Sequence, residues 1–266
     1  MTTTVLYHDD ADGFGSAFAC YHAGGLEDAT YIPVNYGQHV PEIPAGTKEL
    51  YIVDFSYPRD VCDMLAEQYE LTVIDHHKTA KDALEGASYA IFDMSKSGCA
   101  LVWEHFTTDA LPAILRYVQD RDLWLFKLKR SKEVNAYIAT LPFDFETWRG
   151  FDLGVAINAG VAILAFQQQQ IDNAMKRVFL TAISGYIVPL CNATDNISDL
   201  GNAMCAAYPN HPFSVSYCDR SDGSRTFSLR SIGEFDVSAV AKLHDGGGHR
   251  NAAGFVVTLP APLVRV

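Results

Sequence analysis

The sequence contains no long hydrophobic run and no recognisable targeting segment. No stretch reaches the roughly 18 consecutive apolar residues that a membrane span requires. The N-terminus, Met1–Thr4, lacks basic residues and runs into a charged cluster at His8, so neither a secretory signal nor a transit peptide is readable. We therefore expect a cytoplasmic protein with no membrane partner.

The six cysteines are scattered, and no two of them are spaced as Cys-x-x-Cys. Zinc sites and small disulfide frameworks depend on regular cysteine spacing. The pattern therefore favours reduced thiols over either of these.

Basic residues are outnumbered by acidic ones. The chain has 20 Lys and Arg and 32 Asp and Glu, which gives a net charge of −12. This balance disfavours a broad electrostatic footprint for long nucleic acid, including long duplexes. A short oligonucleotide or a small phosphorylated nucleotide, held by a few local cations and metal ions, is compatible with it. The sequence does not distinguish a monomer from a homodimer.

With 266 residues, 48% of them hydrophobic, the chain can bury a sizeable core, and we expect two domains. The first part alternates short β-rich runs with helical patterns, an order typical of a mostly parallel sheet covered by helices. The expected elements are strands Val5–Tyr7, Tyr31–Val34, Leu50–Val53 and Leu71–Ile74, with helices Phe14–His22 and Arg59–Tyr69.

From Ser97 to about Arg177 the pattern becomes helical, and strands return after about Phe179. We interpret the chain as an α/β fold with a mostly parallel-sheet N-terminal domain (1–125), a helical connector (126–180) and a smaller mixed α/β C-terminal domain (181–266). The expected strands of the last domain are Tyr186–Leu190, Phe213–Tyr217, Thr226–Leu229 and Phe255–Leu259.

Acidic and histidine residues follow three of the expected strands of the N-terminal domain. In open α/β sheets, ligands collect beyond the carboxyl ends of the strands, so these side chains should face one crevice. The seven expected neighbours are His8, Asp10, Asp12, Asp54, Asp75, His76 and His77. The Asp75-His76-His77 triplet alone could equally be a helix cap followed by a surface pair, but three such strand ends together favour a common site.

So many acidic groups repel one another strongly in a partly desolvated crevice, and divalent cations would neutralise them. Mixed imidazole and carboxylate ligands suit manganese, with magnesium, iron or cobalt as substitutes. Two such ions about 3.5 to 4 Å apart, bridged by one carboxylate, can clamp a phosphoryl group and generate a hydroxide at neutral pH. The sequence therefore predicts phosphoester hydrolysis.

The sequence resembles the DHH phosphoesterases, a family named for the triplet that stands here at 75–77. The resemblance rests on that triplet and on HDDADG at 8–13, YIVDFS at 51–56, QDRDLW at 119–124 and GGGHRNAAG at 246–254. It covers most of the chain and implies a DHH domain followed by a C-terminal DHH-associated domain. The branches it is most similar to are the short-oligonucleotide phosphodiesterases (nano-RNases) and the exonucleases.

The resemblance implies two metal ions, for which we expect Mn²⁺, with Mg²⁺ or Co²⁺ as substitutes. The implied ligands are His8 and Asp10 on one metal, Asp12, His76 and Asp122 on the other, and Asp54 as the bridge. Asp120 is the alternative to Asp122 as the last ligand.

The resemblance also implies catalytic roles for Asp54, Asp75 and His77. Asp75 would orient its neighbours or join the first metal. His77 would point at the substrate phosphate and stabilise developing charge or protonate the leaving oxygen. Only one residue separates His8 from Asp10, as in some exonuclease-like branches, whereas many nucleotide-cleaving members have a wider spacing, so the subfamily stays open.

A glycine-rich segment, HDGGGHRNAAGF at 244–255, follows a helical pattern and precedes a strand. Consecutive glycines let backbone N–H groups approach an anion closely, although a bare glycine run is more often a flexible turn. Beside the triplet, the segment resembles the substrate-binding motif of the family's C-terminal domain. The implied substrate-binding residues are Arg230, Gly246, Gly247, Gly248, His249 and Arg250. The two domains would then face each other across a cleft.

Two weaker signals have more than one interpretation. Ser97 and Gly98 precede a helical pattern, where capping of the helix is favoured over lining the cleft. Trp103, Trp124 and Trp148 could stack on bases, but we expect at least two of them in the core.

The leading hypothesis is a manganese-dependent phosphodiesterase that cleaves short oligonucleotides to mononucleotides, with removal of a nucleotide 3′-phosphate as a further activity to test. The alternatives among enzymes are hydrolysis of cyclic dinucleotides, of polyphosphate or of single-stranded DNA. The alternative from another class is a non-catalytic binding module with the same fold. Such relatives typically lose ligands, whereas here every expected ligand position is filled.

Overall fold

The computed structural model describes residues 2–35 and 37–258, so the last position of the expected strand Phe255–Leu259 lies outside the described residues. Contacts group the chain into two compact units, residues 1–164 and 165–266, which we call the first and the second unit. Each unit contains one sheet covered by helices, which confirms the predicted α/β class.

The sheet of the first unit has the order β2-β1-β3-β4-β5, and all neighbouring strands in it are parallel. Its strands are β1 (Thr2–His8), β2 (Thr30–Val34), β3 (Thr47–Val53), β4 (Glu70–Asp75) and β5 (Ala90–Phe92). The first four match the predicted strands. The edge strand β5 was not predicted, because three residues are too few to show a periodic pattern.

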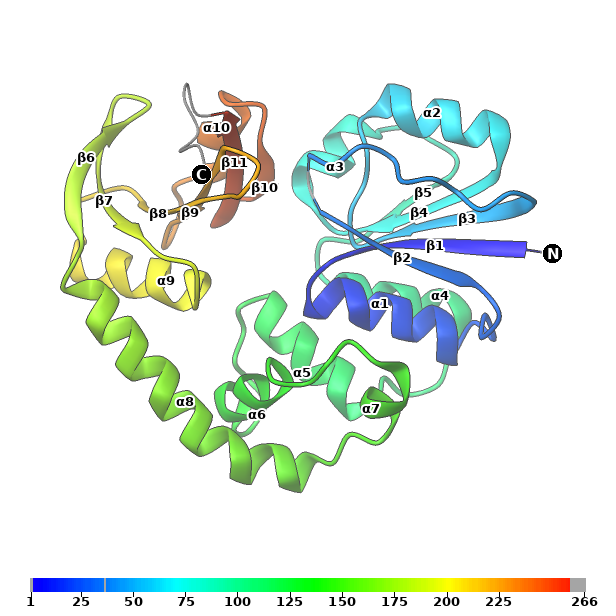
Figure 1. Cartoon of the computed structure of the whole chain (residues 1–266), viewed down its shortest axis with the longest axis horizontal. Helices are drawn as coiled ribbons and strands as arrows, with labels where there is room; N and C mark the ends of the chain where they lie inside the picture. The colour runs from blue at the N-terminus through cyan, green and yellow to red at the C-terminus, as the bar shows by residue number, and fades with distance from the viewer. Residues whose placement is uncertain (1, 36, 259–266) are drawn as a thin grey trace, which may run out of the picture. The chain divides into compact units, whose positions relative to one another are not determined.

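Side chains of this sheet alternate between two cores. On β1, Val5 and Tyr7 pack against one set of helices and Leu6 packs against another. The helices on the first face include α1 (Ala11–His22) and α4 (Gly98–Phe106), and those on the second are α2 (Arg59–Gln68) and α3 (Lys78–Ala83) (Figure 1). Because both faces are buried, the middle of these strands is apolar, as in Val5–Tyr7 of β1 and Leu50–Val53 of β3.

The next four helices along the chain are α5 (Ala113–Asp122), α6 (Ser131–Ile138), α7 (Phe145–Arg149) and α8 (Leu153–Met175). We expected those beyond residue 125 to form a connector. Instead α6, α7 and the start of α8 pack into the core of the first unit through Val134, Ile138, Trp148 and Ala156. The boundary between the units falls within α8. Within the described part of the chain, no helix is both long enough and apolar enough to cross a membrane.

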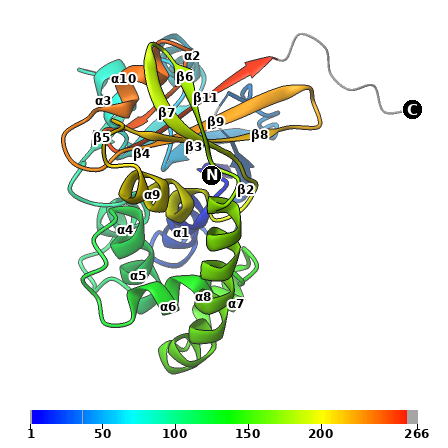
Figure 2. The ribbon, with the colours of Figure 1, turned by 90° about the vertical axis from the view of Figure 1, so that its left-hand side faces the viewer.

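The second unit has a six-stranded mixed sheet in the order β10-β11-β9-β8-β7-β6, in which only β7 and β8 are parallel. Its strands are β6 (Phe179–Ile183), β7 (Tyr186–Asn192), β8 (Ser214–Asp219), β9 (Ser224–Arg230), β10 (Gly247–His249) and β11 (Ala252–Thr258). The helices α9 (Ile197–Ala207) and α10 (Val237–Lys242) belong to separate cores on the two faces (Figure 2). The predicted smaller mixed domain is thus present, with β6 and β10 as additions.

Candidate metal centre

The carboxyl ends of β1, β3 and β4 bring the predicted acidic and histidine side chains together. His8 Nδ1 lies 2.9 Å from Asp10 Oδ2 and 3.8 Å from Asp54 Oδ2. On the other side, His76 Nε2 lies 3.2 Å from Asp54 Oδ1. The two oxygens of one carboxylate therefore face two different imidazoles.

Two groups of donor atoms result from this arrangement, and within each the atoms lie within 4.8 Å of one another. The first group is His8, Asp10 and Asp54, and the second is Asp12, His76 and Asp122. In the second group, His76 Nε2 is 3.5 Å from both Asp12 Oδ2 and Asp122 Oδ2. The structure thus brings the expected ligands together in two groups, with Asp54 in the first group and its Oδ1 facing His76 of the second.

The turn from β1 into α1 is tight, and this fixes the first donors. Asp10 caps α1, because its carboxylate accepts the backbone N–H groups of Asp12 and Gly13 at 3.1 and 2.9 Å. Gly13 packs so closely on β1 that a Cβ there would overlap the carbonyl oxygen of His8. Burial raises the pKa of Asp10, but hydrogen bonding to His8 and its charge outweigh burial and bring the pKa to about 2.

Asp12 is held by the N-terminus of α4. Its carboxylate accepts the backbone N–H groups of Gly98 and Cys99 at 2.7 and 3.1 Å, where the helix dipole also favours an anion. Ser97 occupies the N-cap of α4, as predicted, but its side chain makes no capping hydrogen bond. The contact between Asp12 and α4 could not be predicted from the sequence, because it joins two segments far apart in the chain.

Gly98 also sets the room around Asp54. A Cβ on Gly98 would overlap Asp54 Oδ1 and lie 2.7 Å from Asp54 Cβ and Cγ. Asp54 has a φ of 62°, an uncommon left-handed conformation for a residue other than glycine, and its backbone N–H donates to Ile74 O at 2.9 Å. The missing side chain of Gly98 therefore allows Asp54 to enter the centre.

Asp54 is only 2% exposed, and its Oδ1 has no hydrogen-bond partner among the described residues. Burial raises the pKa of Asp54 well above its ordinary value, and the charges of Asp12 and Asp10 raise it further. Asp75 Oδ2 is likewise buried without a partner in the described part of the chain. Buried carboxylate oxygens left in this way call for a cation.

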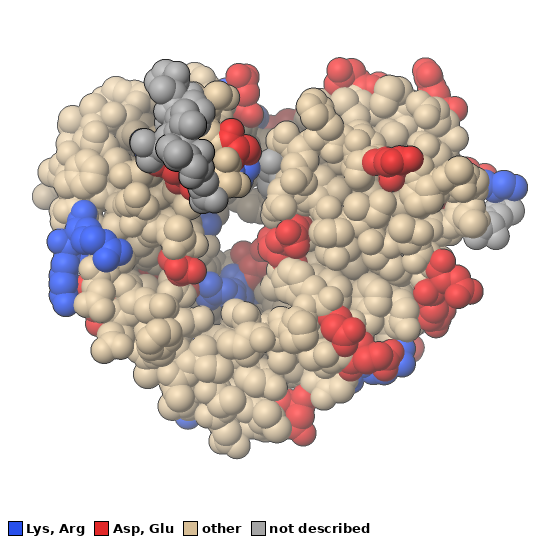
Figure 3. Space-filling view, in the orientation of Figure 1, with Lys and Arg blue, Asp and Glu red and all other residues tan. Residues whose placement is uncertain are grey.

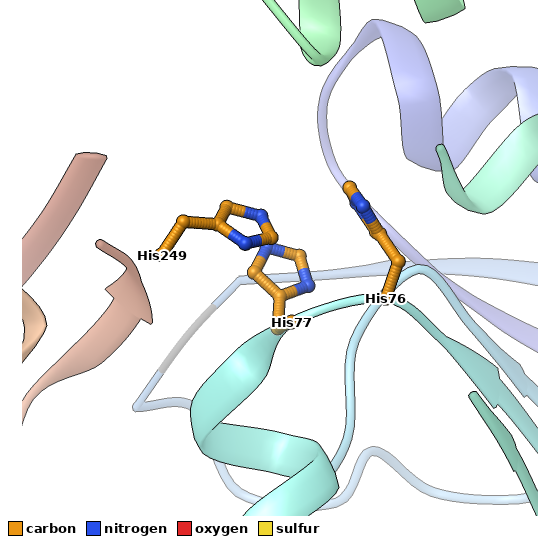
Figure 4. Close-up of side chains that lie close together, drawn as sticks. All are labelled: His76, His77 and His249. Carbon is orange, nitrogen blue, oxygen red and sulfur yellow. The ribbon is translucent and has the colours of Figure 1, made fainter. Parts of the chain in front are cut away.

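The triplet at 75–77 turns the end of β4 into α3 (Figure 4). Asp75 Oδ1 accepts the backbone N–H groups of His76 and His77 at 2.7 and 3.1 Å and lies 2.7 Å from His77 Nδ1. Burial lowers the pKa of His76. Burial acts on His77 in the same direction, but the charge of Asp75 outweighs it and raises the pKa of His77 to about 9.

The structure separates the two candidate aspartates at the end of α5. Asp122 reaches the second donor group, and burial together with the charge of Asp12 raises the pKa of Asp122 well above its usual value. Asp120 is 4% exposed and binds the backbone N–H groups of Lys127 and Leu128 at 2.9 and 3.1 Å instead. Asp120 therefore holds a loop, while Asp122 joins the centre.

The donor set fits divalent cations. Each group combines an imidazole with carboxylates, a mixture that suits Mn²⁺ and related ions better than the thiolate sets typical of structural zinc. The surface of the first unit is also acidic, and Figure 3 shows Asp and Glu side chains at several places over it. A cation at the centre would offset part of this charge.

The second unit contains the predicted substrate-binding residues. Gly247, Gly248 and His249 form β10, which pairs with β11 in a hairpin, and Gly246 precedes it. A Cβ at Gly248 would lie 2.6 Å from Ala252 O, and one at Gly246 would lie 2.6 Å from Phe255 Cβ. Close packing thus accounts for these two glycines, whatever else they bind.

The two predicted arginines of this unit both contact neighbouring groups. Arg230 ends β9, and its guanidinium donates to Ser198 Oγ and Leu229 O at 2.8 and 2.9 Å. Arg250 is half exposed and lies 2.7 Å from Glu234 Oε2. Arg230 is therefore held against α9, whereas Arg250 forms a surface ion pair.

Known proteins resemble this chain in sequence. Residues 2–127, which contain both donor groups, match the model of the DHH family, N-terminal domain. An uncharacterized protein, R106, from Acanthamoeba polyphaga mimivirus is 33% identical over a 279-residue alignment that covers 94% of this chain. The chain spans 66% of the length of that viral protein, just under two thirds.

Two solved structures share the fold at low sequence identity. RecJ from Thermus thermophilus in complex with Mn²⁺ has a TM-score of 0.51 and 15% identity, covering 96% of this chain and 49% of that one. CDC45 from Entamoeba histolytica has a TM-score of 0.50 and 8% identity, covering 96% and 92%. Residues 2–127 are therefore identified as an N-terminal domain of the DHH family.

Proposed function

We propose that this protein is a divalent-cation-dependent phosphodiesterase that cleaves short oligonucleotides to mononucleotides. The observation that carries the proposal is the carboxylate of Asp54, whose two oxygens face two separate donor groups. A carboxylate that bridges paired cations is the arrangement used for phosphoryl hydrolysis. The related fold of RecJ, described in complex with Mn²⁺, supports Mn²⁺ as the first cation to test, with Mg²⁺ and Co²⁺ as substitutes.

The residues of the centre would bind two cations. His8 and Asp10 would hold one, Asp12, His76 and Asp122 the other, and Asp54 both. When bound, such cations supply positive charge that draws in a phosphate and favours ionisation of an attacking water. Gly98 and Cys99 keep Asp12 in place through their backbone N–H groups.

His77 is the candidate for contact with the substrate. Asp75 lies 2.7 Å from its Nδ1, which orients the imidazole ring. We assign to His77 the stabilisation of charge on a phosphate oxygen or the protonation of the leaving oxygen. Asp75 is then a positioning residue, because it acts through His77.

The glycine hairpin of the second unit is the proposed grip for the far end of the substrate. Gly246, Gly247 and Gly248 are partly exposed and carry no side chains that would cover their backbone N–H groups, and His249, Arg230 and Arg250 add donors nearby in sequence or strand pairing. The net charge of −12 disfavours long polymers.

The test is turnover by the full chain, stripped with a chelator and reloaded with Mn²⁺. The substrates are end-labelled RNA and DNA of two to five nucleotides, a 3′,5′-bisphosphate nucleotide, a cyclic dinucleotide and polyphosphate. We expect mononucleotide release from the short oligonucleotides and the highest kcat/KM among them. A higher kcat/KM for the cyclic dinucleotide or polyphosphate would replace the proposed substrate and leave the centre intact.

Asp54→Asn is the variant that connects turnover to the centre. Because it removes the bridging charge, we expect a loss of kcat of about 10³-fold or more. Asp60→Asn, at an exposed position of α2 in the same unit, is the matched control and should keep full activity. No release from any substrate with Mn²⁺, Mg²⁺ or Co²⁺ would end the proposal.

A further inference from the structure

The loop after Asp122 has an unusual backbone. Trp124 and Phe126 have φ values of 55° and 48°, and Arg130 has 60°. Bulky residues rarely adopt this left-handed conformation, which costs about 1–3 kcal/mol at each position and persists only where the surroundings impose it. Conformations of this kind are concentrated at binding and catalytic sites.

Asp120 imposes the shape of this loop. Its backbone carbonyl accepts the N–H groups of Leu125 and Phe126 at 2.9 and 3.2 Å. Its carboxylate accepts those of Lys127 and Leu128 at 2.9 and 3.1 Å. Successive amides from 125 to 128 therefore all bind one buried residue, which makes the loop rigid before any ligand arrives.

The rigid loop presents an aromatic ring at the surface. Trp124 is 38% exposed, whereas Trp103 and Trp148 are 6% and 1% exposed. The ring of Phe126 stands edge-on to that of Trp124, with centroids 4.9 Å apart, and the guanidinium of Arg121 lies 5.5 Å from the Trp124 centroid. An exposed indole supported by a second ring and accompanied by a cation has the features of a base-stacking surface.

Trp124 is also close to the centre along the chain. Its Cα is at most about 7 Å from that of Asp122, because two residues of chain span no more. The carboxylate of Asp122 belongs to the second donor group. In a nucleotide only the sugar separates the base from the phosphate, so a phosphate at the centre brings a base within reach of this loop.

We propose that Trp124 is the stacking surface for a nucleobase next to the scissile phosphate, and that Asp120 is the positioning residue that keeps its loop in shape. This inference rests on the proposed function, since it takes a nucleotide as the substrate. Stacking provides affinity without hydrogen bonds to base edges, so Trp124 accepts all four bases.

The experiment compares a 5′-phosphorylated dinucleotide that carries both bases with the same backbone lacking both. We expect Trp124→Ala to raise KM for the base-bearing substrate by about 5- to 100-fold and for the abasic one by less than about twofold, since stacking contributes about 1–3 kcal/mol per base. Trp124→Phe keeps most of the affinity. Phe166→Ala, at a 59% exposed aromatic on α8, is the matched control and changes neither KM.

A binding measurement that does not depend on turnover completes the test. Adenosine monophosphate with Mn²⁺ is expected to quench the indole fluorescence of the wild-type protein and to leave that of Trp124→Phe unchanged, because the other two tryptophans are buried. Asp120→Asn keeps the indole but loosens the loop, so it should raise KM for the base-bearing substrate alone.

Equal KM increases for both substrates in Trp124→Ala, or undiminished quenching in Trp124→Phe, would overturn the stacking role. A wild-type protein that cleaves neither substrate but shows the Trp124-dependent quenching would instead overturn the proposed function. The two failures are thus distinguishable.

Discussion

The two units of this chain differ sharply in charge. Residues 1–164 contain 24 Asp and Glu against 12 Lys and Arg, whereas residues 165–266 contain eight of each, so the first unit accounts for the whole net charge of −12. The first unit also buries carboxylates, among them Asp12, Asp54 and Asp75. Among residues 165–258 of the second unit, the buried polar side chains are serines such as Ser214 and Ser216.

This difference makes the first unit the candidate for binding a cation. A buried hydroxyl without a partner costs about 1–3 kcal/mol, while a buried carboxylate without one costs far more unless a cation or a proton compensates it. The first unit accepts this cost at the ends of its strands, where its conformation at Asp54 is also uncommon. At Asp54 the fold imposes a burial and a backbone conformation that an aspartate does not favour locally, as is common at functional sites.

Asp54→Asn should have the largest effect, because it removes one of the buried carboxylates that distinguish the first unit from the second. In chelator at pH 7 we expect the free energy of unfolding to increase by about 1–3 kcal/mol, because the variant removes a buried ionisable group whose folded-state pKa is raised. A raised folded pKa lowers stability once pH exceeds the ordinary value of about 4, so the gain should vanish near pH 4. Denaturant unfolding across this pH range measures it, and an unstable variant at pH 7 would contradict the assignment.

Gly98→Ala should damage the centre without altering the second unit. The new Cβ would displace Asp54 or the start of α4, so we expect a fall in kcat of about 10²-fold and loss of the stabilisation that Mn²⁺ gives to the wild-type protein. Gly150→Ala is the control, because its Cβ would meet nothing closer than 3.4 Å. Thermal unfolding with and without Mn²⁺ compares the two. Retention of the Mn²⁺ shift in Gly98→Ala would show that the centre tolerates the added carbon.

Gly248→Ala should destabilise the second unit and leave the response of the first unit to Mn²⁺ unchanged. It combines a φ of 133° with a close approach to Ala252 O, so we expect a loss of stability of about 1–3 kcal/mol. Gly233→Ala, with a φ of 81° and open space around it, separates backbone strain from the clash. Hydrogen exchange within 179–258 reports the loss. A changed Mn²⁺ response in Gly248→Ala would mean that the two units are not independent in this respect.

Ser216→Ala should produce the smallest change. Its hydroxyl is buried and lacks a hydrogen-bond partner in the described part of the chain, so removing it should raise the free energy of unfolding by about 1 kcal/mol. Denaturant unfolding of Ser216→Ala and Asp54→Asn measures both free energies of unfolding and compares an unpaired hydroxyl with an unpaired carboxylate. A loss above about 1 kcal/mol would reveal a partner for Ser216 that the structure does not show.

Much of the first unit could be predicted because its signals are local. Buried parallel strands give continuous apolar runs, and acidic and histidine residues directly follow three of them. The rule that parallel strands end at one edge then brings His8, Asp54 and His76 together without further information. The short strands β5 and β10 and the extension of the first unit into α8 carry no comparable local signal.

The distinction between Asp120 and Asp122 shows where such reasoning ends. Both stand at the end of α5, two residues apart, and nothing in the local pattern separates a ligand from a residue that holds a loop. The outcome depends on which carboxylate faces the amides of 127–128 and which faces His76. The roles of Ser97 and Gly98 are decided in the same way, by a partner elsewhere in the chain.

The contact between Asp12 and α4 also constrains when the centre can form. Asp12 receives hydrogen bonds from residues 86 and 87 positions further along the chain. During synthesis, β1 and α1 emerge early but cannot fix this carboxylate until residues 98 and 99 follow, and Asp122 is made later still. Under the proposed function, cations would therefore bind late in the life of each new chain, after the sheet has paired and its loops have closed.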